Sequence, residues 1–239
     1  MVKTCRARRR EIRARRLTMT LFRFLKYVVS VQKYPRYFVD MYYVPHLLAF
    51  TWRRQGVTLG RGIVWSGVPI VSLSPRSRIQ IGERCAICSR SVQTALGVNH
   101  PVVLRTLRPG AELRIGEGVR MSGTTICAAQ KVEIGNRCVI GANVTIVDTD
   151  FHSLDPIIRS SPEDGDLASK KEVLIGNDVF IGGGSYILKG VKVGDCAVIG
   201  ASSIVVSDIP KGAIVAGNPA RILRMLGDRK ATSRHMEVS

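Results

Sequence analysis

Apolar residues recur at a constant spacing of six near the C-terminus of this chain. The members of the series are Ile175, Ile181, Ile187, Val193, Ile199 and Val205, and Gly176, Gly182, Gly194 and Gly200 directly follow four of them. A short fixed period over this distance is typical of a solenoid, in which an aliphatic side chain fills a narrow interior and a glycine takes a corner where a Cβ would crowd the backbone. Three such rungs would make one triangular coil of about 18 residues, with successive coils about 4.8 Å apart.

The same spacing continues toward the N-terminus, with slips of phase. The interior positions expected there are Leu59, Trp65, Val71, Ile81, Ile87, Val103, Pro109, Ile115, Met121, Cys127, Ile134, Ile140 and Ile146. Longer interruptions fall at roughly 94–102 and at 148–172, and the second, which holds two prolines and many charges, is predicted to project as a loop from one corner. The pattern therefore predicts an all-β solenoid over 57–216, preceded by an extension over 1–56 and followed by a turn and tail over 217–239.

Composition and charge agree with an elongated domain and add a question about the N-terminus. Aromatic residues make up 6% of the 239 residues against 45% apolar, which suits a core of stacked Ile and Val. The first sixteen residues supply +7 of the net charge of +18. This segment is a basic tail or, together with the apolar residues over 17–29, a basic amphipathic helix for an anionic membrane face. The extension is predicted to be partly helical.

The sequence also disfavours several classes of function. No segment resembles a base-reading module, so nucleic acid is not an expected partner. The apolar stretch Tyr42–Trp52 is too short to span a bilayer, and charges interrupt any secretion signal. Six cysteines do not make a disulfide framework in a chain of this length. Cys85 and Cys138 each follow an Ile anchor by four residues, where they are expected to be small buried fillers, a usage that suits a reducing cytoplasm.

His152 is the candidate for acid–base chemistry. It stands at the start of the 148–172 interruption, with Asp148, Asp150 and Asp155 close in sequence. A neutral imidazole held through its other nitrogen is a suitable general base near pH 7, although a histidine that caps a loop would look the same. Asp148, Asp150 and a backbone carbonyl are all candidates for holding the ring. His100, in the other interruption, is a turn residue or lines a substrate site, whereas His46 and His235 lie outside the repeat and are given no role.

Part of the sequence resembles a known protein family. The run Asn143-Val144-Thr145-Ile146, the Asp-rich stretch with His152, and the segment 173–223 resemble the hexapeptide-repeat acyltransferases, most closely the branch of galactoside, maltose and nodulation-factor O-acetyltransferases. The resemblance implies a left-handed parallel β-helix, a homotrimer, and acetyl-coenzyme A bound in the cleft between neighbouring prisms. It also implies that the projecting loop reaches over the adjacent subunit's site.

The resemblance assigns roles to individual positions. His152 would take the proton from the acceptor hydroxyl, and the Gly183 backbone N–H would stabilise the oxyanion. The remaining positions would hold the cofactor, along its pantetheine and nucleotide groove (Ala201, Val206, Ser207) and at its phosphates (Arg221, Arg224). At the place where the sugar enzymes carry an acceptor-binding Asn, this chain has Ser122, whose hydroxyl is the substitute. Ser122, His100 and Asp150 are therefore the acceptor-site candidates.

The expected function is a cytoplasmic O-acetyltransferase that moves acetyl from acetyl-coenzyme A to a hydroxyl of a saccharide or glycan, with peripheral contact at the inner membrane face through the basic N-terminus. An N-acetyltransferase acting on an amino sugar and a catalytically silent scaffold remain alternatives. A metalloenzyme of the γ-carbonic anhydrase type would need three histidines converging on zinc, and only His100 and His152 lie in the repeat, so no metal is expected.

Overall fold

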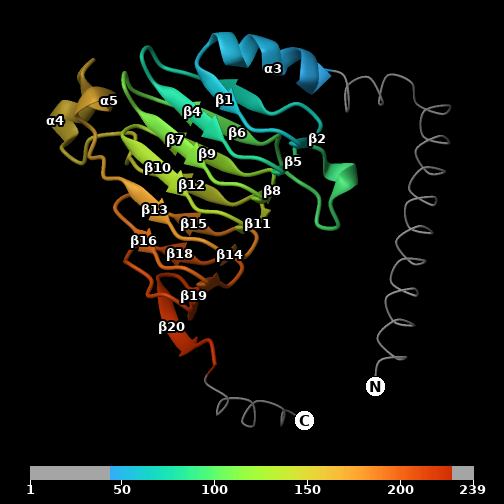
Figure 1. Ribbon diagram of the computed structural model, residues 1–239. Coiled ribbons are helices and arrows are strands. Elements are labelled where there is room, and N and C mark those ends of the chain that lie inside the picture. Colours follow the sequence, from blue (N-terminus) through green and yellow to red (C-terminus); the bar gives the residue numbers. More distant parts are fainter. Residues whose placement is uncertain (1–43, 228–239) are drawn as a thin grey trace, which may run out of the picture.

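The computed structural model describes residues 44–227, which form a three-sided prism of stacked coils with a helix across one end (Figure 1). The first sheet contains β1 (Val57–Leu59), β4 (Arg78–Ile81), β7 (Glu112–Ile115), β10 (Lys131–Ile134), β13 (Val173–Ile175) and β16 (Lys192–Val193). The second contains β2 (Val64–Ser66), β5 (Ala86–Cys88), β8 (Arg120–Ser122), β11 (Val139–Ala142), β14 (Phe180–Ile181), β17 (Val198–Ile199), β19 (Ala213–Gly217) and β20 (Ala220–Met225). The third contains β3 (Ile70–Ser72), β6 (Val103–Thr106), β9 (Thr125–Ala128), β12 (Thr145–Val147), β15 (Tyr186–Ile187) and β18 (Ile204–Val205).

The chain visits the three sheets in turn, so each coil contributes one parallel strand to each face. This arrangement gives six complete coils, and β19 extends the second sheet beyond them. We call the corner line between the second and third sheets the second–third edge, and the line between the third and first sheets the third–first edge. These two edges carry the loops discussed below.

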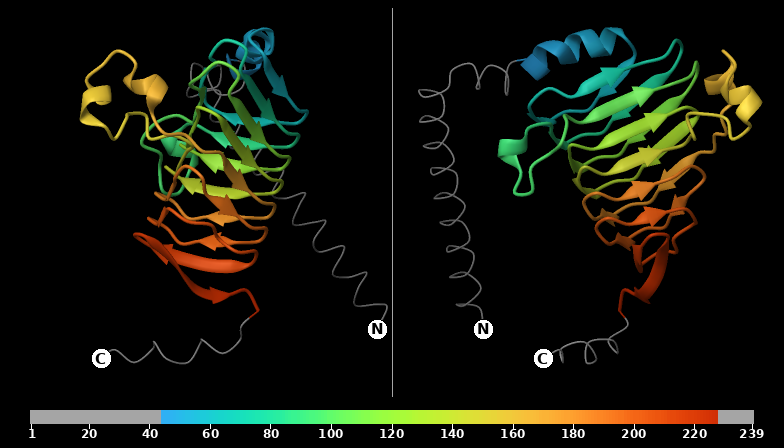
Figure 2. Two further views of the ribbon diagram at one scale, coloured as in Figure 1. Left: turned by 90° about the vertical axis from the view of Figure 1, so that its left-hand side faces the viewer. Right: turned by 180° about the vertical axis from the view of Figure 1, so that it is seen from behind.

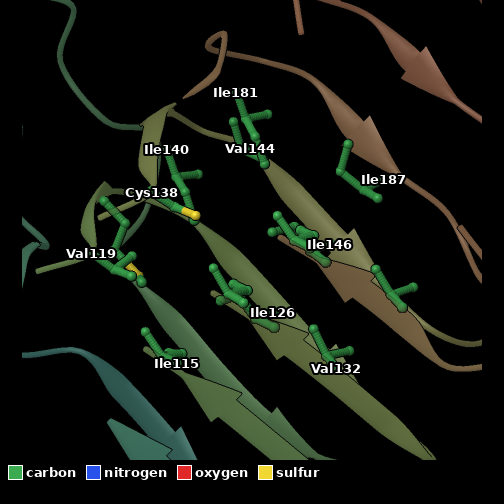
Figure 3. Close-up of a cluster of buried hydrophobic side chains, with 14 of the residues drawn as sticks. Ile115, Val119, Ile126, Val132, Cys138, Ile140, Val144, Ile146, Ile181 and Ile187 are labelled. Atoms are coloured by element: carbon green, nitrogen blue, oxygen red, sulfur yellow. The ribbon is translucent and has the colours of Figure 1, made fainter. Parts of the chain in front are cut away.

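The core is a column of aliphatic side chains in register. In the first sheet Ile134 lies beside Ile115 on one side and Ile175 on the other, and in the third sheet Ile126, Ile146 and Ile187 form an equivalent row (Figure 3). All six members of the C-terminal series are at most 3% exposed, which confirms that spacing of six as the interior period. Each fully buried aliphatic side chain stabilises the fold by about 1.5–3 kcal/mol.

The glycines that follow the anchors are required by crowding. A Cβ on Gly182 would lie 2.4 Å from the backbone nitrogen of Ala201 in the next coil, and one on Gly194 would lie 2.4 Å from that of Lys211. Contacts this short do not occur for real Cβ atoms, so any side chain here would force successive coils apart. The predicted reason for these glycines is confirmed.

Three expected interior positions in the N-terminal half are wrong. Leu104 and Ile126 are 0% exposed, whereas Val103 is half-buried and the 6%-exposed Cys127 follows the true interior residue by one position. Pro109 lies in an exposed turn between β6 and β7. The physical reason is that the corners vary in length. Met121 and Ile126 are five residues apart because the corner between β8 and β9 is one residue short, and the β8–β11 register shifts accordingly.

Cys85 and Cys138 are both 0% exposed, which confirms them as small buried fillers. Their thiols approach the carbonyl oxygens of Gly116 and Gly176 in the next coils, at 3.2 and 3.1 Å. Burial raises the pKa of both thiols, which keeps them protonated. The five cysteines among residues 44–227 are all free.

Two segments leave the prism on opposite sides (Figure 1). Residues 148–172 depart from the third–first edge between β12 and β13 and contain α4 (Pro156–Arg159) and α5 (Asp164–Leu167). The shorter segment, between β5 and β6, departs from the second–third edge and begins with the 3-10 helix η2 (Ser91–Gln93).

The two ends of the prism are closed differently. The helix α3 (Val44–Arg54) packs against β1, and no helix among residues 44–227 is long and apolar enough to cross a membrane. At the other end, Ala220–Met225 form β20, which pairs antiparallel with β19. The expected turn and tail from 217 onward is therefore wrong over these residues. The reason is that β20 provides hydrogen-bond partners for the backbone of β19, which would otherwise be an open strand edge.

Some predictions concern residues that the structure does not describe. These are the basic segment 1–16, the apolar stretch 17–29, His235 and the side chain of His46.

Candidate active site

His152 stands where the third sheet passes into the projecting loop. Directly after β12 the chain turns at Phe151, whose φ of 65° lies in the left-handed region, and the His152 N–H donates to the Asp150 carbonyl at 2.7 Å. The turn directs the imidazole outward, so that 69% of its side-chain surface is exposed. Its position as an accessible group at the mouth of the loop follows from this local geometry.

Asp164 holds the imidazole. Its Oδ2 lies 2.5 Å from His152 Nδ1, and its Oδ1 accepts the Ser153 N–H at 2.6 Å. The hydrogen bond from the Ser153 backbone, followed by that from His152, holds the pKa of the Asp164 carboxyl below its usual range. An ionised carboxylate at Nδ1 makes that nitrogen the proton donor, which leaves the lone pair on Nε2. The arrangement can accept a proton at Nε2.

The loop that carries Asp164 is anchored to the prism. Asp155 caps α4 by accepting the Ile157 N–H at 2.8 Å, and Arg159 donates to the Ser153 carbonyl at 3.1 Å. Asp166, two residues beyond Asp164, lies 2.5 Å from Arg108 in the turn between β6 and β7. The position of Asp164 therefore depends on ties to the first half of the chain.

The expectation that Asp148, Asp150 or a backbone carbonyl orients His152 is wrong. Asp148 is 0% exposed, and its carboxylate accepts three backbone N–H groups of the preceding coil at 2.6–2.7 Å. Asp150 forms an ion pair with Lys189 at 2.9 Å. The carboxylates of Asp148 and Asp150 both bind groups of neighbouring coils. The residue that contacts the His152 ring is Asp164, twelve residues further along the chain in the folded loop.

Gly183 and Ala201 stack on the second–third edge, where they follow β14 and β17. The carbonyl of Gly183 accepts the Ser202 N–H at 2.9 Å, and a Cβ on Gly183 would lie 3.0 Å from the Ala142 oxygen. In the part of the chain that the structure describes, the half-buried Gly183 donates its own N–H to no acceptor. A free N–H on a rigid corner can stabilise an oxyanion.

His152 and Gly183 lie on different edges of one prism. His152 follows a strand of the third sheet, whereas Gly183 follows a strand of the second. A single protomer therefore does not bring the predicted base and the predicted oxyanion donor together. Asp150 shares the edge of His152, and Ala201 shares the edge of Gly183.

The predicted acceptor residues Ser122 and His100 also lie on the second–third edge. Ser122 is half-buried at the end of β8, and its carbonyl accepts the Asn143 N–H at 3.1 Å. The Asn143 side chain accepts the Asn99 N–H at 2.8 Å and so ties the 94–102 segment to the prism. His100 Nδ1 lies 2.7 Å from the Pro101 carbonyl, which makes Nδ1 the donor and leaves Nε2 available.

Several residues that were predicted to hold the cofactor lie near the C-terminal end of the prism. Ser207 and Arg221 line one pocket of about 300 Å³, together with Ala220 and Ile222 of β20. Val206 is 51% exposed beside Ser207, and Arg224 is exposed on β20 opposite Ile214. A larger hollow of about 610 Å³ lies on the outer face of the first sheet, between Lys131 and Lys211, and contains none of the predicted residues.

Two groups that matter here were missed by the sequence analysis. Asp164 stands in the acidic run Glu163-Asp164-Gly165-Asp166 of the loop, and that run was the available signal. Arg108, which anchors the loop through Asp166, stands in no pattern of the sequence that indicates this contact.

Among residues 44–227, no three His, Cys, Asp or Glu side chains converge as a metal-binding group would require.

Comparison with known proteins agrees with this architecture. Residues 172–206 match the family described as bacterial transferase hexapeptide (six repeats), and residues 131–147 match the hexapeptide repeat of succinyl-transferase. Both matched segments are hexapeptide repeats, and the chain is similar to the hexapeptide-repeat acetyltransferases. Its fold is accordingly the left-handed parallel β-helix that the resemblance implied.

The relatives are similar over part of their lengths. The chain is 36% identical over 121 residues to the galactoside O-acetyltransferase of Escherichia coli (strain K12), which covers 50% of this chain and 57% of that protein. It is 44% identical over 61 residues, 26% of each chain, to a 2,3,4,5-tetrahydropyridine-2,6-dicarboxylate N-acetyltransferase of Clostridium perfringens. A solved galactoside acetyltransferase in complex with coenzyme A superimposes with a TM-score of 0.50 and 26% identity, covering 81% of this chain and 78% of that one. The chain thus spans little more than half of the galactoside enzyme it matches, and a quarter of the N-acetyltransferase.

Proposed function

We propose that this protein transfers an acetyl group from acetyl-coenzyme A to a hydroxyl of a saccharide or glycan. The observation that carries the proposal is the pair formed by His152 and Asp164, an exposed imidazole held by an ionised carboxylate in the longer of the two loops that leave the prism between residues 44 and 227. Similarity to a galactoside acetyltransferase that was solved with coenzyme A supports both the donor and the acceptor class.

The reaction needs one base and one oxyanion donor. The acceptor oxygen attacks the thioester carbon while His152 Nε2 removes its proton, and the carbonyl oxygen becomes an oxyanion that the Gly183 N–H stabilises. The tetrahedral intermediate then collapses, the carbon–sulfur bond breaks, and the coenzyme A thiolate takes the proton back from the imidazolium. Asp164 is a positioning residue that keeps Nδ1 protonated throughout and stabilises the transient imidazolium.

The proposed site is shared between protomers of a homotrimer. His152 and Gly183 lie on different edges of one prism, so a neighbouring copy must supply one of them. Coenzyme A would then lie in the cleft between two prisms, along Ala201, Val206 and Ser207, with its phosphates at Arg221 and Arg224. On the acceptor side we place Ser122 and His100, which share the edge of Gly183, and Asp150, which shares the edge of His152. A soluble supply of acetyl-coenzyme A fits a cytoplasmic location.

An N-acetyltransferase is the second candidate function, because one relative with 44% identity over 61 residues is named as having that activity.

The two candidates are tested by measuring thiol release from acetyl-coenzyme A by the purified protein, with matched panels of saccharides and amino sugars. We expect acceptor-dependent release with a saccharide, and a loss of at least about 10²-fold in His152→Ala. Release with amino sugars alone would replace the proposal by N-acetylation. Absence of both release and acetyl-coenzyme A binding would leave a silent scaffold.

A further inference from the structure

The helix α3 is a cap whose outer face is apolar. It lies across the N-terminal end of the prism (Figures 1 and 2). Its inner face buries Ala49 and Trp52, and the Trp52 ring packs against Trp65 of the first coil with centroids 5.6 Å apart. On the outer face Leu47 is 70% exposed and Phe50 is 61% exposed. The terminal cap of a repeat protein ordinarily presents a polar outer face. The apolar outer face of α3 is therefore a candidate surface for binding a partner.

Basic side chains surround this apolar face. Arg53 and Arg54 are exposed in the last turn of α3, and the Arg54 guanidinium lies 5.1 Å from the centre of the Phe50 ring. Arg76 lies at the same end, where it lines a groove with Gln55 directly after the helix. The side chain of Arg61 in the first coil is 92% exposed and forms a surface ion pair with Glu83 at 3.1 Å.

Within residues 44–227 the positive charge is concentrated at this end. Residues 44–90 contain seven Arg and a single acidic residue, Glu83, a net charge of +6. Residues 91–227 contain fourteen Lys and Arg against thirteen Asp and Glu, a net charge of +1. The end that exposes Leu47 and Phe50 therefore carries most of the net positive charge of the described residues.

We propose that the N-terminal end of the prism docks on an anionic phospholipid surface. Leu47 and Phe50 would enter the boundary between headgroups and acyl chains, and the arginines around them would lie at the level of the lipid phosphates. Charge complementarity selects this occupant. A second copy would bring one strongly positive end against another, and nucleic acid would leave the two apolar side chains without a contact.

The test uses the full chain and large unilamellar vesicles of phosphatidylcholine alone or of phosphatidylcholine with about 30% phosphatidylglycerol, whose negative surface attracts Lys and Arg side chains. We expect co-sedimentation with the anionic vesicles only, weakened by salt. In Leu47→Ser/Phe50→Ser the partition coefficient should fall at least about tenfold, because two apolar side chains no longer insert. The matched control is Leu223→Ser/Leu226→Ser, two exposed leucines on and just after β20 at the opposite end, which should bind like the wild type.

Tryptophan fluorescence gives an independent measurement. The chain has two tryptophans, Trp52 and Trp65, and both lie at this end. Brominated phosphatidylglycerol should quench them in the wild type and in the control, and should quench much less in Leu47→Ser/Phe50→Ser. Arg53→Gln/Arg54→Gln alters no apolar residue but removes two positive charges. It should weaken binding to the anionic vesicles and also make that binding less sensitive to salt.

Three results would overturn the proposal. One is a wild type that does not bind anionic vesicles. Another is a double variant that binds as tightly as the wild type, which would assign membrane contact to residues before α3. The third is a change of oligomeric state in Leu47→Ser/Phe50→Ser without lipid, which would assign the apolar face to a second copy. Far-ultraviolet circular dichroism of each variant establishes that it is folded before binding is scored.

Discussion

Asp164 fixes two groups at once, the imidazole of His152 through one carboxylate oxygen and the Ser153 backbone through the other. The two bonds define both the tautomer of the ring and its direction from the prism. An exposed histidine on a loop would otherwise sample several rotamers and both neutral tautomers. In the proposed mechanism this carboxylate is what directs the exposed His152 ring as a base.

Asp164→Asn should therefore lower kcat with little change in KM for acetyl-coenzyme A. An amide in place of the carboxylate can present its NH₂ group to Nδ1, which selects the wrong tautomer, and a loss of about 10²-fold or more is expected. Steady-state kinetics with a saturating acceptor measure the effect.

Asp166→Asn is the matched control for that variant. It removes a carboxylate from the same short helix, but one that contacts Arg108 instead of the imidazole. Its kcat should stay within a few-fold of the wild type. Equal losses in the two variants would mean that loop anchoring, and not the imidazole contact, accounts for the effect.

The lowered pKa of Asp164 predicts a pH dependence of stability. An unfolded Asp titrates near 3.9, and the folded carboxyl titrates below that value. Its contribution to stability is therefore fully present above about pH 4 and is lost as the pH falls through the lower folded pKa. The difference in Tm between wild type and Asp164→Asn should be constant from neutral pH down to about pH 5 and should shrink below pH 4. A difference that grows on acidification would contradict this assignment.

At the scale of the elements, the corners of the coils are joined by side chains that accept backbone N–H groups of a neighbouring coil. The Asn177 side chain accepts the Asn136 N–H at 2.8 Å, and Asp195 accepts the Asn177 N–H at 2.7 Å. Asp148 is the most committed of these groups, since its buried carboxylate accepts three N–H groups where β9 passes into β10. The start of the projecting loop is thus fixed by a turn whose N–H groups all have an acceptor.

Asp148→Ala should destabilise the protein strongly. Three N–H groups would lose their acceptor, two of them from partly buried positions, at a cost of about 3 kcal/mol or more. Thermal unfolding should show a Tm lower by roughly 6–12 °C. In Asp208→Ala, where one exposed carboxylate accepts only the Lys192 N–H, the Tm should change by a third of that or less. A Tm of Asp148→Ala equal to that of Asp208→Ala would rule out the structural role of Asp148.

The sequence predicted these elements best where the corners are uniform. From Ile175 to Val205 every rung has six residues, and every interior position is confirmed. In the N-terminal half the short corner before Ile126 shifted the expected interior residue to Cys127, because an apolar residue stands at both positions and spacing alone does not choose between them. His152 could be picked out by its place after β12. Asp164 could not be singled out from the acidic run that contains it, because the fold of a projecting loop leaves no periodic pattern in the sequence.

At the scale of the whole molecule, His152 and Gly183 lie on different edges of one prism, so the active site proposed above needs an assembly of copies. In a closed ring of three copies, each site would combine the base of one protomer with the oxyanion donor of the next. The outward columns beside the second–third edge include the exposed Phe180 and Tyr186, whereas the first sheet presents charged residues such as Arg114 and Lys192. The apolar columns suit contact between copies.

Subunit complementation tests this arrangement. His152→Ala and Gly183→Val are each expected to be inactive, the first because it lacks the base and the second because its side chain blocks the donor. When the two are unfolded, mixed in equal amounts and refolded, random trimers should regain about a quarter of wild-type activity, since three-quarters are mixed and each mixed ring has one intact site in three. Sedimentation of each variant alone establishes that it assembles. If the site instead used His152 and Gly183 of the same chain, no mixture would contain an intact site and activity would stay at the level of the separate variants. Recovery near one quarter therefore requires a site that spans two chains, and because the same fraction is expected for a closed ring of any size, the sedimentation measurement is what establishes a ring of three.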